Sequence, residues 1–303
     1  MTDLPQSLLR LIVEESASPR PPAMVAVAKA ARRRHHDSIL AVLLYGSCLR
    51  ERAVVGKIVD LYLLADSYTT LYPNPVMRTV NRLLPPNVYY IEESFEGVQV
   101  AAKYAIVTLD QFEKLVSRRV LQPYFWARFA QPAVILWTAN DAVQRRLQRA
   151  LGEAVGTMVQ ETLPLMADGW SSADLWQRAF AETYRTELRA ERNDQAERLY
   201  RAFAARYDRA TEALCESIGA AAPAAARKRA SSRWQRRRIV GKLLSVLRLF
   251  KASFTFEDGA AYLAWKIRRH SGVAVELTPW QRRHPVLAAS VLAWRLYRSG
   301  GFR

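Results

Sequence analysis

The sequence predicts an α/β protein in which a mixed sheet, flanked by helices, is followed by a helical domain and a basic amphipathic C-terminal segment. Two continuous apolar runs, 39–45 (ILAVLLY) and 57–66 (KIVDLYLLAD), have the length and composition of buried strands. Helical periodicity dominates from residue 141 to about 215. Positive charge is concentrated after residue 226. Together these features favour an α/β body followed by a strongly basic C-terminal segment.

The first part of the chain alternates helix and strand signals. Residues 5–37 favour helix with a proline-rich break, and Gly46-Ser47 is expected to form a tight turn between the two apolar strands, which should therefore be neighbours. The remaining predicted elements are a short helix within 67–86, strands at 87–92 and 98–108 joined by a turn at Gly97, and a helix at 109–119.

Length and composition suggest three segments. We expect an α/β domain over 1–140, a helical domain over 141–219, and a basic linker with a C-terminal segment over 220–303; the family resemblance described below implies that the helical domain is winged-helix-like and that the C-terminal segment associates with a membrane. Of the 45 Lys and Arg residues, 18 lie in 227–303 against only 3 Asp or Glu. This end of the chain is therefore expected to face phosphates, either of an anionic membrane or of nucleic acid.

The stretch 233–252 predicts an amphipathic basic helix. Val240, Leu243 and Leu247 recur at helical spacing together with Leu244 and Phe250. The cations lie largely off that face: Arg236, Arg237, Lys242, Arg248 and Lys251. Packing of the apolar stripe on the protein and contact with a membrane surface are both left open.

Several classes of protein are disfavoured. Two cysteines, Cys48 and Cys215, without metal-ligand spacing disfavour a disulfide framework and a zinc site. The N-terminus has no secretory pattern, and the longest uncharged apolar run, 285–294, is about half of the roughly 20 residues a spanning helix needs. We expect a peripheral membrane protein on the cytoplasmic face.

The Gly46-Ser47 turn and Asp60 on the following strand are the candidate chemical site. A glycine turn lets backbone amides approach phosphates, a serine hydroxyl adds a donor, and a carboxylate binds Mg²⁺. Transfer of a nucleotidyl group needs these parts, because it depends on positioning and on metal electrostatics. A carboxylate on a buried strand is also costly unless it is paired or binds a metal.

A second carboxylate is not supplied by the same strand. The position two residues after Asp60 is Tyr62, and Asp66 is six residues away, about 20 Å along an extended strand. The candidates from elsewhere in the chain are Glu92, Glu93 and Glu187.

Five segments in order carry a family resemblance. They are YGS (45–47), VDLYLLAD (59–66), NVYYIE (87–92), AAKYAIVTLDQFEKL (101–115) and PYFWARFAQPAVIL (123–136). The series resembles the mitochondrial-type phosphatidate cytidylyltransferases of the nucleotidyltransferase superfamily. TYRTELRAE (183–191) and RRRIVGKLLSVLRLFKASF (236–254) are similar to later segments of that family.

The resemblance implies a Mg²⁺-dependent enzyme that joins CTP and phosphatidic acid to give CDP-diacylglycerol and pyrophosphate. It also implies that 1–140 is a nucleotidyltransferase domain. By position, Gly46 and Ser47 would hold the triphosphate and Asp60 would bind the metal. The other residues carried over are Lys103 and Arg128, facing phosphates, and Glu187 and Arg189, lining the cleft from the second domain.

The sequence departs from the family at several positions: Ala105 and Ala127 replace glycine, Gln131 replaces lysine, and Glu187 replaces aspartate. Loss of the cation at 131 leaves the lipid acceptor open. The alternatives are a nucleotidyltransferase with another acceptor, such as RNA, a small alcohol or a protein hydroxyl, and a non-catalytic domain that binds anionic lipid or nucleic acid. Lys103 and Arg128 also admit plain structural roles, in solvent or in a surface ion pair.

Overall fold

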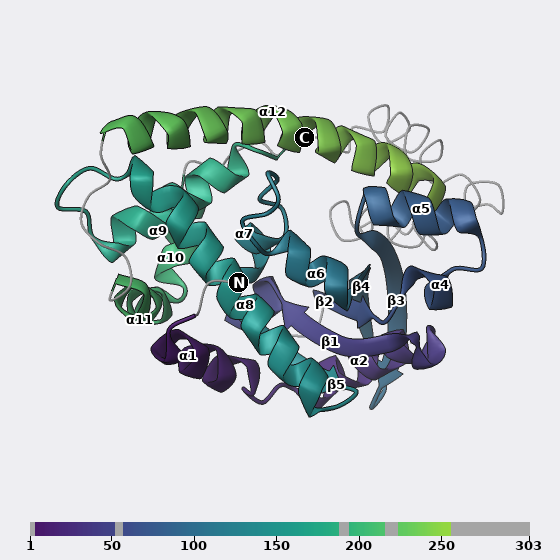
Figure 1. Cartoon of the computed structure of the whole chain (residues 1–303). Coiled ribbons are helices and arrows are strands. Elements are labelled where there is room, and N and C mark those ends of the chain that lie inside the picture. Colours follow the sequence, from purple (N-terminus) through teal and green to yellow (C-terminus); the bar gives the residue numbers. More distant parts are fainter. Residues whose placement is uncertain (1–3, 52–56, 188–193, 216–223, 256–303) are drawn as a thin grey trace, which may run out of the picture.

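The computed structural model describes residues 4–51, 57–187, 194–215 and 224–255. It is a mixed α/β fold in which one sheet is flanked by helices and joined to a helical region (Figure 1). The five strands are β1 (Ile39–Tyr45), β2 (Ile58–Ala65), β3 (Asn87–Phe95), β4 (Val98–Thr108) and β5 (Ala133–Thr138).

The sheet has the order β3-β4-β2-β1-β5, with only β2 and β4 parallel. The four predicted strands form, and the first two are neighbours as expected. Their connection is not the predicted tight turn, because the short helix α3 (Ser47–Glu51) begins directly after Gly46. The prediction missed β5, a six-residue strand that follows Pro132 and has only partial alternation.

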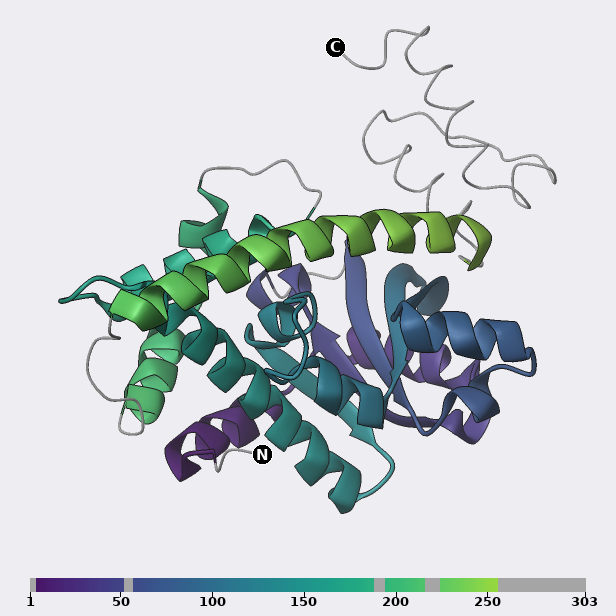
Figure 2. The same ribbon diagram turned by 45° about the horizontal axis from the view of Figure 1, so that its top comes forward.

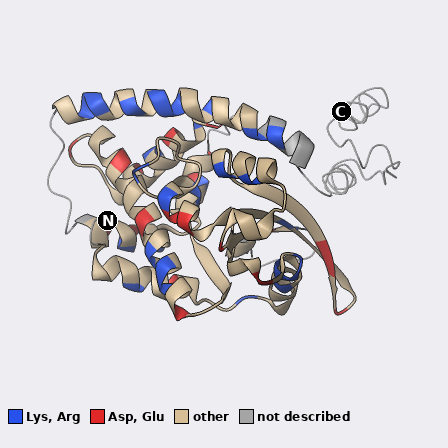
Figure 3. Ribbon diagram, turned by 45° about the vertical axis from the view of Figure 1, so that its right-hand side comes forward, with Lys and Arg blue, Asp and Glu red and all other residues tan. Residues whose placement is uncertain are grey.

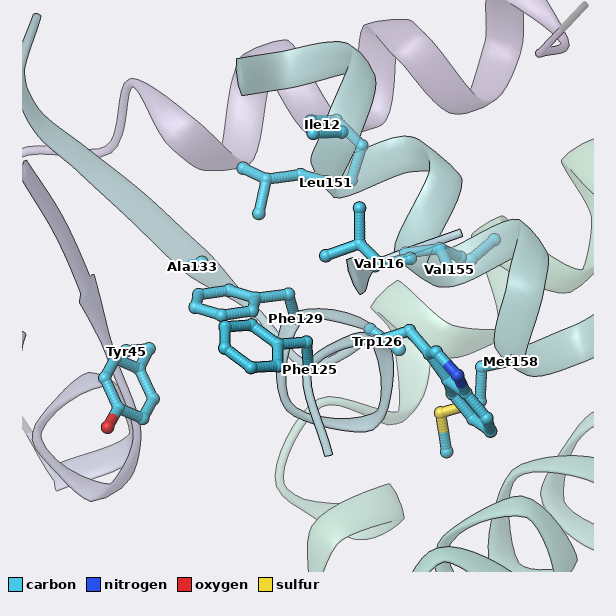
Figure 4. Close-up of a cluster of buried hydrophobic side chains, with 14 of the residues drawn as sticks. Ile12, Tyr45, Val116, Phe125, Trp126, Phe129, Ala133, Leu151, Val155 and Met158 are labelled. Carbon is cyan, nitrogen blue, oxygen red and sulfur yellow. The ribbon is translucent and has the colours of Figure 1, made fainter. Parts of the chain in front are cut away.

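Helices cover both faces of the sheet. On one face, α2 (Pro22–Arg33) packs on β3 and β4. On the other face lie α6 (Leu109–Leu115), α7 (Trp126–Phe129) and α8 (Asp141–Thr162), and α1 (Gln6–Ser16) packs against α8 and β5. The larger core forms on this second side, where Phe125 and Phe129 lie between Tyr45 and the α8 residues (Figure 4).

Where the structure describes residues 141–215, their regular elements are all helices. The α8 helix begins at an Asn140 cap, and α9 (Ser172–Tyr184) begins with a capping box between Ser171 and Asp174. The remaining short elements are η1 (His36–Ser38), α4 (Tyr68–Leu71), α5 (Pro75–Leu83), η2 (Leu163–Leu165), α10 (Gln195–Arg201) and α11 (Ala204–Cys215).

The basic end begins with one long helix, α12 (Ala224–Thr255), which crosses the molecule from the helical region to α5 (Figures 1 and 2). Residues 224–232 form its first turns, so this part of the chain is not the linker that its low complexity predicted. Alanine favours helix, and the alanines here alternate with arginine and lysine, which also have high helix propensity. The part of the expected C-terminal segment that follows residue 255 lies outside the described residues.

The structure bears on the question that the sequence left open for α12: of the predicted apolar positions, Leu243 and Leu247 are exposed, and Val240 and Leu244 are half-buried. The buried side of α12 includes Trp234 and the fully buried Arg237, while large apolar side chains point outward. The exposed set is Ile239 (72%), Leu243 (58%), Val246 (51%) and Leu247 (39%), which we call the α12 apolar stripe. Lys and Arg recur along the whole helix (Figure 3). The helix therefore packs on the body through some of its cations, and the α12 apolar stripe remains exposed.

Two buried carboxylates explain this orientation. Glu161 of α8 pairs with Arg237 at 2.9 Å, and Glu182 of α9 pairs with Arg238 at 2.7 Å. Both acids also pair with arginines outside α12. Arg237 is fully buried, however, and a buried cation without a partner is costly, so its pairing with Glu161 holds the arginine side of the helix against the body. Gly241 permits the close approach, because a Cβ there would lie 2.6 Å from the Thr186 carbonyl oxygen.

Among the described residues, no helix combines the length and the apolar character needed to cross a membrane.

Candidate functional site

Gly46 and Asp60 lie side by side at one end of the sheet. Tyr45, the last residue of β1, is the cross-strand partner of Asp60 on β2. Gly46 then adopts a left-handed backbone, with φ +88°, and a Cβ placed there would lie 3.0 Å from Oδ2 of Asp60. Glycine is required twice, for the backbone angle and for the room left to the carboxylate. Ser47 follows as the first residue of α3.

Lys103 is the second charged group at this place. It lies opposite Asp60 in the parallel β2–β4 pair, and its Nζ is 3.7 Å from Oδ1 of Asp60. Both side chains keep contact with solvent, at 35% exposed for Lys103 and 26% for Asp60. The pair is therefore accessible to a ligand, and its mutual attraction is weakened by water.

One row of side chains crosses the sheet here. Tyr45, Asp60, Lys103 and Tyr90 are in register on β1, β2, β4 and β3, so they share one face. The row lies on the side covered by α7 and α8, because Tyr45 belongs to that core cluster. Three strands, β1, β2 and β4, thus place the glycine corner, a carboxylate and an ammonium group in line.

Arg128 of α7 lies beside this row. Its Nη1 donates to the hydroxyl of Tyr124 at 2.8 Å and to that of Tyr62 at 3.4 Å, and its guanidinium lies over the rings of Tyr45 and Tyr124. Burial would lower the pKa of Arg128, but these tyrosines, together with Glu187, raise it. Arg128 is a fixed cation held by phenol groups, not a surface ion pair.

Arg248 of α12 is a cation that the sequence did not assign to the site. Its guanidinium lies 4.3 Å from the Tyr124 ring, and it donates to the Pro85 carbonyl at 2.8 Å and to Gln122 at 2.9 Å. Burial would raise the pKa of Tyr124, yet Arg128 and Arg248 lower it overall. The only available sequence signal was an arginine inside the apolar run LLSVLRLF.

Glu187 lies near both arginines. It follows α9 and is half-buried, and its charge favours the protonated forms of Arg128 and Arg248. The helical region thus brings a carboxylate within electrostatic range of Arg128 and Arg248, and the role of Glu187 in a cleft stays a prediction. Arg189, the other residue predicted from that region, lies outside the described residues.

The other carboxylate candidates are separated by strand alternation. Glu93 points to the opposite face of β3 and pairs with Arg33 of α2 at 3.3 Å. It is therefore excluded as a partner of Asp60. Glu92 shares the face of Tyr90 and accepts its hydroxyl at 2.6 Å, but it lies on the edge strand, two strands from Asp60. Asp66 lies beyond the far end of β2, as expected.

Cys48, next to the corner, is a structural residue. Its thiol donates to the Ile58 carbonyl at 3.3 Å, and the side chain is buried. Burial, followed by the nearby Asp60 charge, raises the pKa of the Cys48 thiol. A thiol held in this form is a poor nucleophile and a poor metal ligand.

The residues around Asp60 fit a magnesium site in which the protein supplies a single carboxylate. Among the described residues, no three His, Cys, Asp or Glu side chains gather at one place. Magnesium commonly uses one or two carboxylates and completes its shell with water and substrate phosphates. Asp60 would be the protein ligand, and the room left by Gly46 is the space in which phosphates would approach it.

Comparison with models of known protein families gives no match, and no curated protein matches the chain.

Proposed function

We propose that this protein is a Mg²⁺-dependent nucleotidyltransferase that transfers a cytidylyl group from CTP to phosphatidic acid at a membrane surface, on a nucleotidyltransferase-type fold. The single observation that carries the proposal is the contact between the left-handed Gly46 corner and the accessible Asp60 carboxylate. This is the arrangement that a triphosphate and its metal require. The resemblance of five ordered sequence segments supplies the choice of CTP and phosphatidic acid.

In this reaction a phosphate oxygen of phosphatidic acid attacks the α-phosphorus of CTP. The bond from that phosphorus to the bridging oxygen breaks, and pyrophosphate leaves with the bonding electrons. Gly46 and Ser47 would hold the triphosphate, and Lys103 would balance its charge. Arg128 would bind a phosphate, and its hydrogen bonds to two tyrosine hydroxyl groups support this role because they already fix the guanidinium. Magnesium, when bound at Asp60, supplies charge neutralisation and orientation.

The α12 apolar stripe supports the membrane part of the proposal. Four large apolar side chains are exposed on a helix that also carries Arg236 and Lys242 in exposed positions. Apolar side chains flanked by cations suit the interface of an anionic bilayer, where each near-surface cation contributes about 1 kcal/mol. The same charges would also attract nucleic acid, so the partner has to be tested directly.

The test is transfer of label from each of the four α-labelled nucleoside triphosphates, with Mg²⁺, to phosphatidic acid in vesicles. We expect labelled CDP-diacylglycerol from CTP alone. Asp60→Asn should reduce turnover by at least 10³-fold, on the order of one lost metal or oxyanion contact. Asp66→Asn, on the far end of the same strand, should retain activity. The absence of Mg²⁺-dependent nucleotide binding would favour the non-catalytic alternative, and transfer to RNA, a small alcohol or a protein hydroxyl would replace the lipid acceptor. An active Asp60→Asn enzyme would remove Asp60 from the mechanism.

A further inference from the structure

A cavity of about 520 Å³ lies between the first half of α12 and segment 116–125, which joins α6 to α7. Cavities of about 300 to 1,000 Å³ are the usual size of ligand sites. The lining consists of Leu121, Lys228, Arg229, Ser232, Arg233 and Arg236. Its α12 members recur at helical spacing, so four cations and a hydroxyl group share one side of the helix.

Three of these cations have no partner in the part of the chain that the structure describes. Lys228, Arg229 and Arg236 are exposed, and none of them makes a hydrogen bond or an ion pair with another described residue. The hydroxyl of Ser232 is likewise exposed and unpartnered there. These donor groups therefore reach solvent, and an anion binds them without breaking a contact within the protein.

The lining contains no carboxylate that would neutralise its four cations. Arg233 Nη1 lies 3.3 Å from Glu161, but the same carboxylate also pairs with Arg118 and Arg237. Three arginines against one carboxylate leave this group with an excess of two positive charges. Like charges three or four positions apart on a helix repel each other and destabilise it. A bound anion would relieve that repulsion.

This half of α12 is anchored to the body beside the cavity. Trp234 Nε1 donates to the Glu161 carbonyl at 2.9 Å, and Arg237 Nε donates to the Leu121 carbonyl at 2.8 Å. The second of these bonds joins α12 directly to the segment that supplies Leu121 to the lining. The exposed cations therefore extend from a fixed backbone, which reduces the loss of conformational freedom when a ligand binds.

We propose that this cavity is an anion site that binds a phosphate group with two or more negative charges, carried by a soluble molecule or by a lipid headgroup. Guanidinium groups bind phosphate with paired hydrogen bonds, and a lysine adds a compact charge. The lining shares no residue with the Gly46 and Asp60 site. The inference therefore goes beyond the proposed function and stands whether or not the chain is a nucleotidyltransferase.

Two arms of one experiment on the full-length protein separate the two sources of phosphate. In the first arm, pyrophosphate is titrated calorimetrically with EDTA present, because ligand binding at Asp60 is expected to need magnesium. A soluble source predicts one pyrophosphate per chain, bound at least tenfold more tightly than acetate. In the second arm, flotation with vesicles that contain phosphatidic acid is compared with flotation with neutral vesicles. A lipid source predicts flotation only with the anionic vesicles. Binding in neither arm overturns the proposal.

Charge variants locate the binding. Arg229→Gln with Arg236→Gln removes two exposed cations that make no contact with another described residue, so the fold should be kept and binding should weaken at least tenfold. Arg145→Gln with Arg149→Gln, exposed on α8, removes the same charge elsewhere and should bind normally. Asp60→Asn should also bind normally. Equal weakening in the two double variants would assign the binding to net charge and overturn the proposal.

A variant that fills the cavity keeps every charge. Ser232→Trp should weaken binding at least tenfold, whereas Gln235→Trp, exposed on the same helix but outside the lining, should bind normally. Normal binding by Ser232→Trp would place the ligand elsewhere and overturn the proposal. Single-stranded RNA is the competing partner for a basic surface. Binding of RNA that requires Arg229 and Arg236, without binding of either phosphate probe, would assign the cavity to nucleic acid and also overturn the proposal.

Discussion

A Cβ at position 46 would lie 3.0 Å from Oδ2 of Asp60, so Gly46 and the carboxylate form one unit. This close approach joins the end of β1 to Asp60 on β2, the residue predicted to bind the metal. Any larger side chain at position 46 has to displace the carboxylate or the turn.

Gly46→Ala should therefore abolish cytidylyl transfer. The substitution places a side chain at φ +88° and against Asp60, and the backbone strain alone costs about 1 kcal/mol or more. Gly97→Ala is the matched control, because Gly97 has φ +78° and open space around it. Urea unfolding should show comparable losses in both variants, whereas only Gly46→Ala should lose Mg²⁺-dependent CTP binding. Normal CTP binding by Gly46→Ala would show that the Gly46 turn does not contribute to the nucleotide site.

The α12 apolar stripe should control vesicle binding. The double variant Ile239→Ser with Leu243→Ser removes two exposed apolar side chains, each contributing about 1.5 kcal/mol if buried in lipid. Flotation with vesicles containing phosphatidic acid should fall at least tenfold while CTP binding is unchanged. Val13→Ser with Val25→Ser changes two exposed valines on α1 and α2 and should leave flotation unchanged. Equal losses in both double variants would contradict a membrane role for this stripe.

Arg248 should couple α12 to the tyrosine cluster. Arg248→Gln removes a cation that lies 4.3 Å from the Tyr124 ring, so the pKa of Tyr124 should rise. Tyrosinate absorbance, measured against a Tyr124→Phe reference, reports that pKa. Lys242→Gln removes an exposed cation from the same helix and should leave the titration unchanged. An unchanged Tyr124 titration in Arg248→Gln would show that the arginine serves only to anchor α12.

His35 should make stability depend on pH in the acid range. Burial, followed by the charges of Arg34 and His36, lowers the pKa of His35 to about 4. A histidine whose folded pKa is lowered stabilises the fold above its unfolded pKa near 6.5 and loses that contribution as the pH falls toward about 4. Solvent screening at this half-buried ring reduces the expected loss to about 2 kcal/mol.

The measurement is urea unfolding from pH 7 to pH 4. His35→Gln keeps a partner for the Tyr104 hydroxyl, 3.1 Å from the histidine ring, but removes the titrating group, so its stability should fall less over this range. His36→Gln, at the exposed neighbour, leaves the buried ring in place and removes only the smallest of the three causes, so it should follow the wild type closely. Parallel curves for His35→Gln and the wild type would assign the acid sensitivity to other groups.

The strands and the chemical corner could be predicted because their signals are local. The apolar run 39–45 coincides with β1, and the run 98–108 coincides with β4. Alternation along β2 places Asp60 on the same face as Tyr62. The proximity of Asp60 to Gly46 followed from the prediction that the strands before and after the glycine are neighbours. The roles of Ser47, Lys103, Arg128 and Glu187 in catalysis remain predictions.

The sequence did not determine which residues far apart in the chain come into contact. The exclusion of Glu93 and the addition of Arg248 both depended on pairings between segments far apart in the chain. The same holds for α12, whose periodicity defines an apolar side and a cationic side but not which of them faces the body. Glu161 and Glu182, buried on other helices, pair with Arg237 and Arg238 and so hold this side against the body, because a buried arginine is costly without a partner whereas leucines in contact with solvent are tolerated.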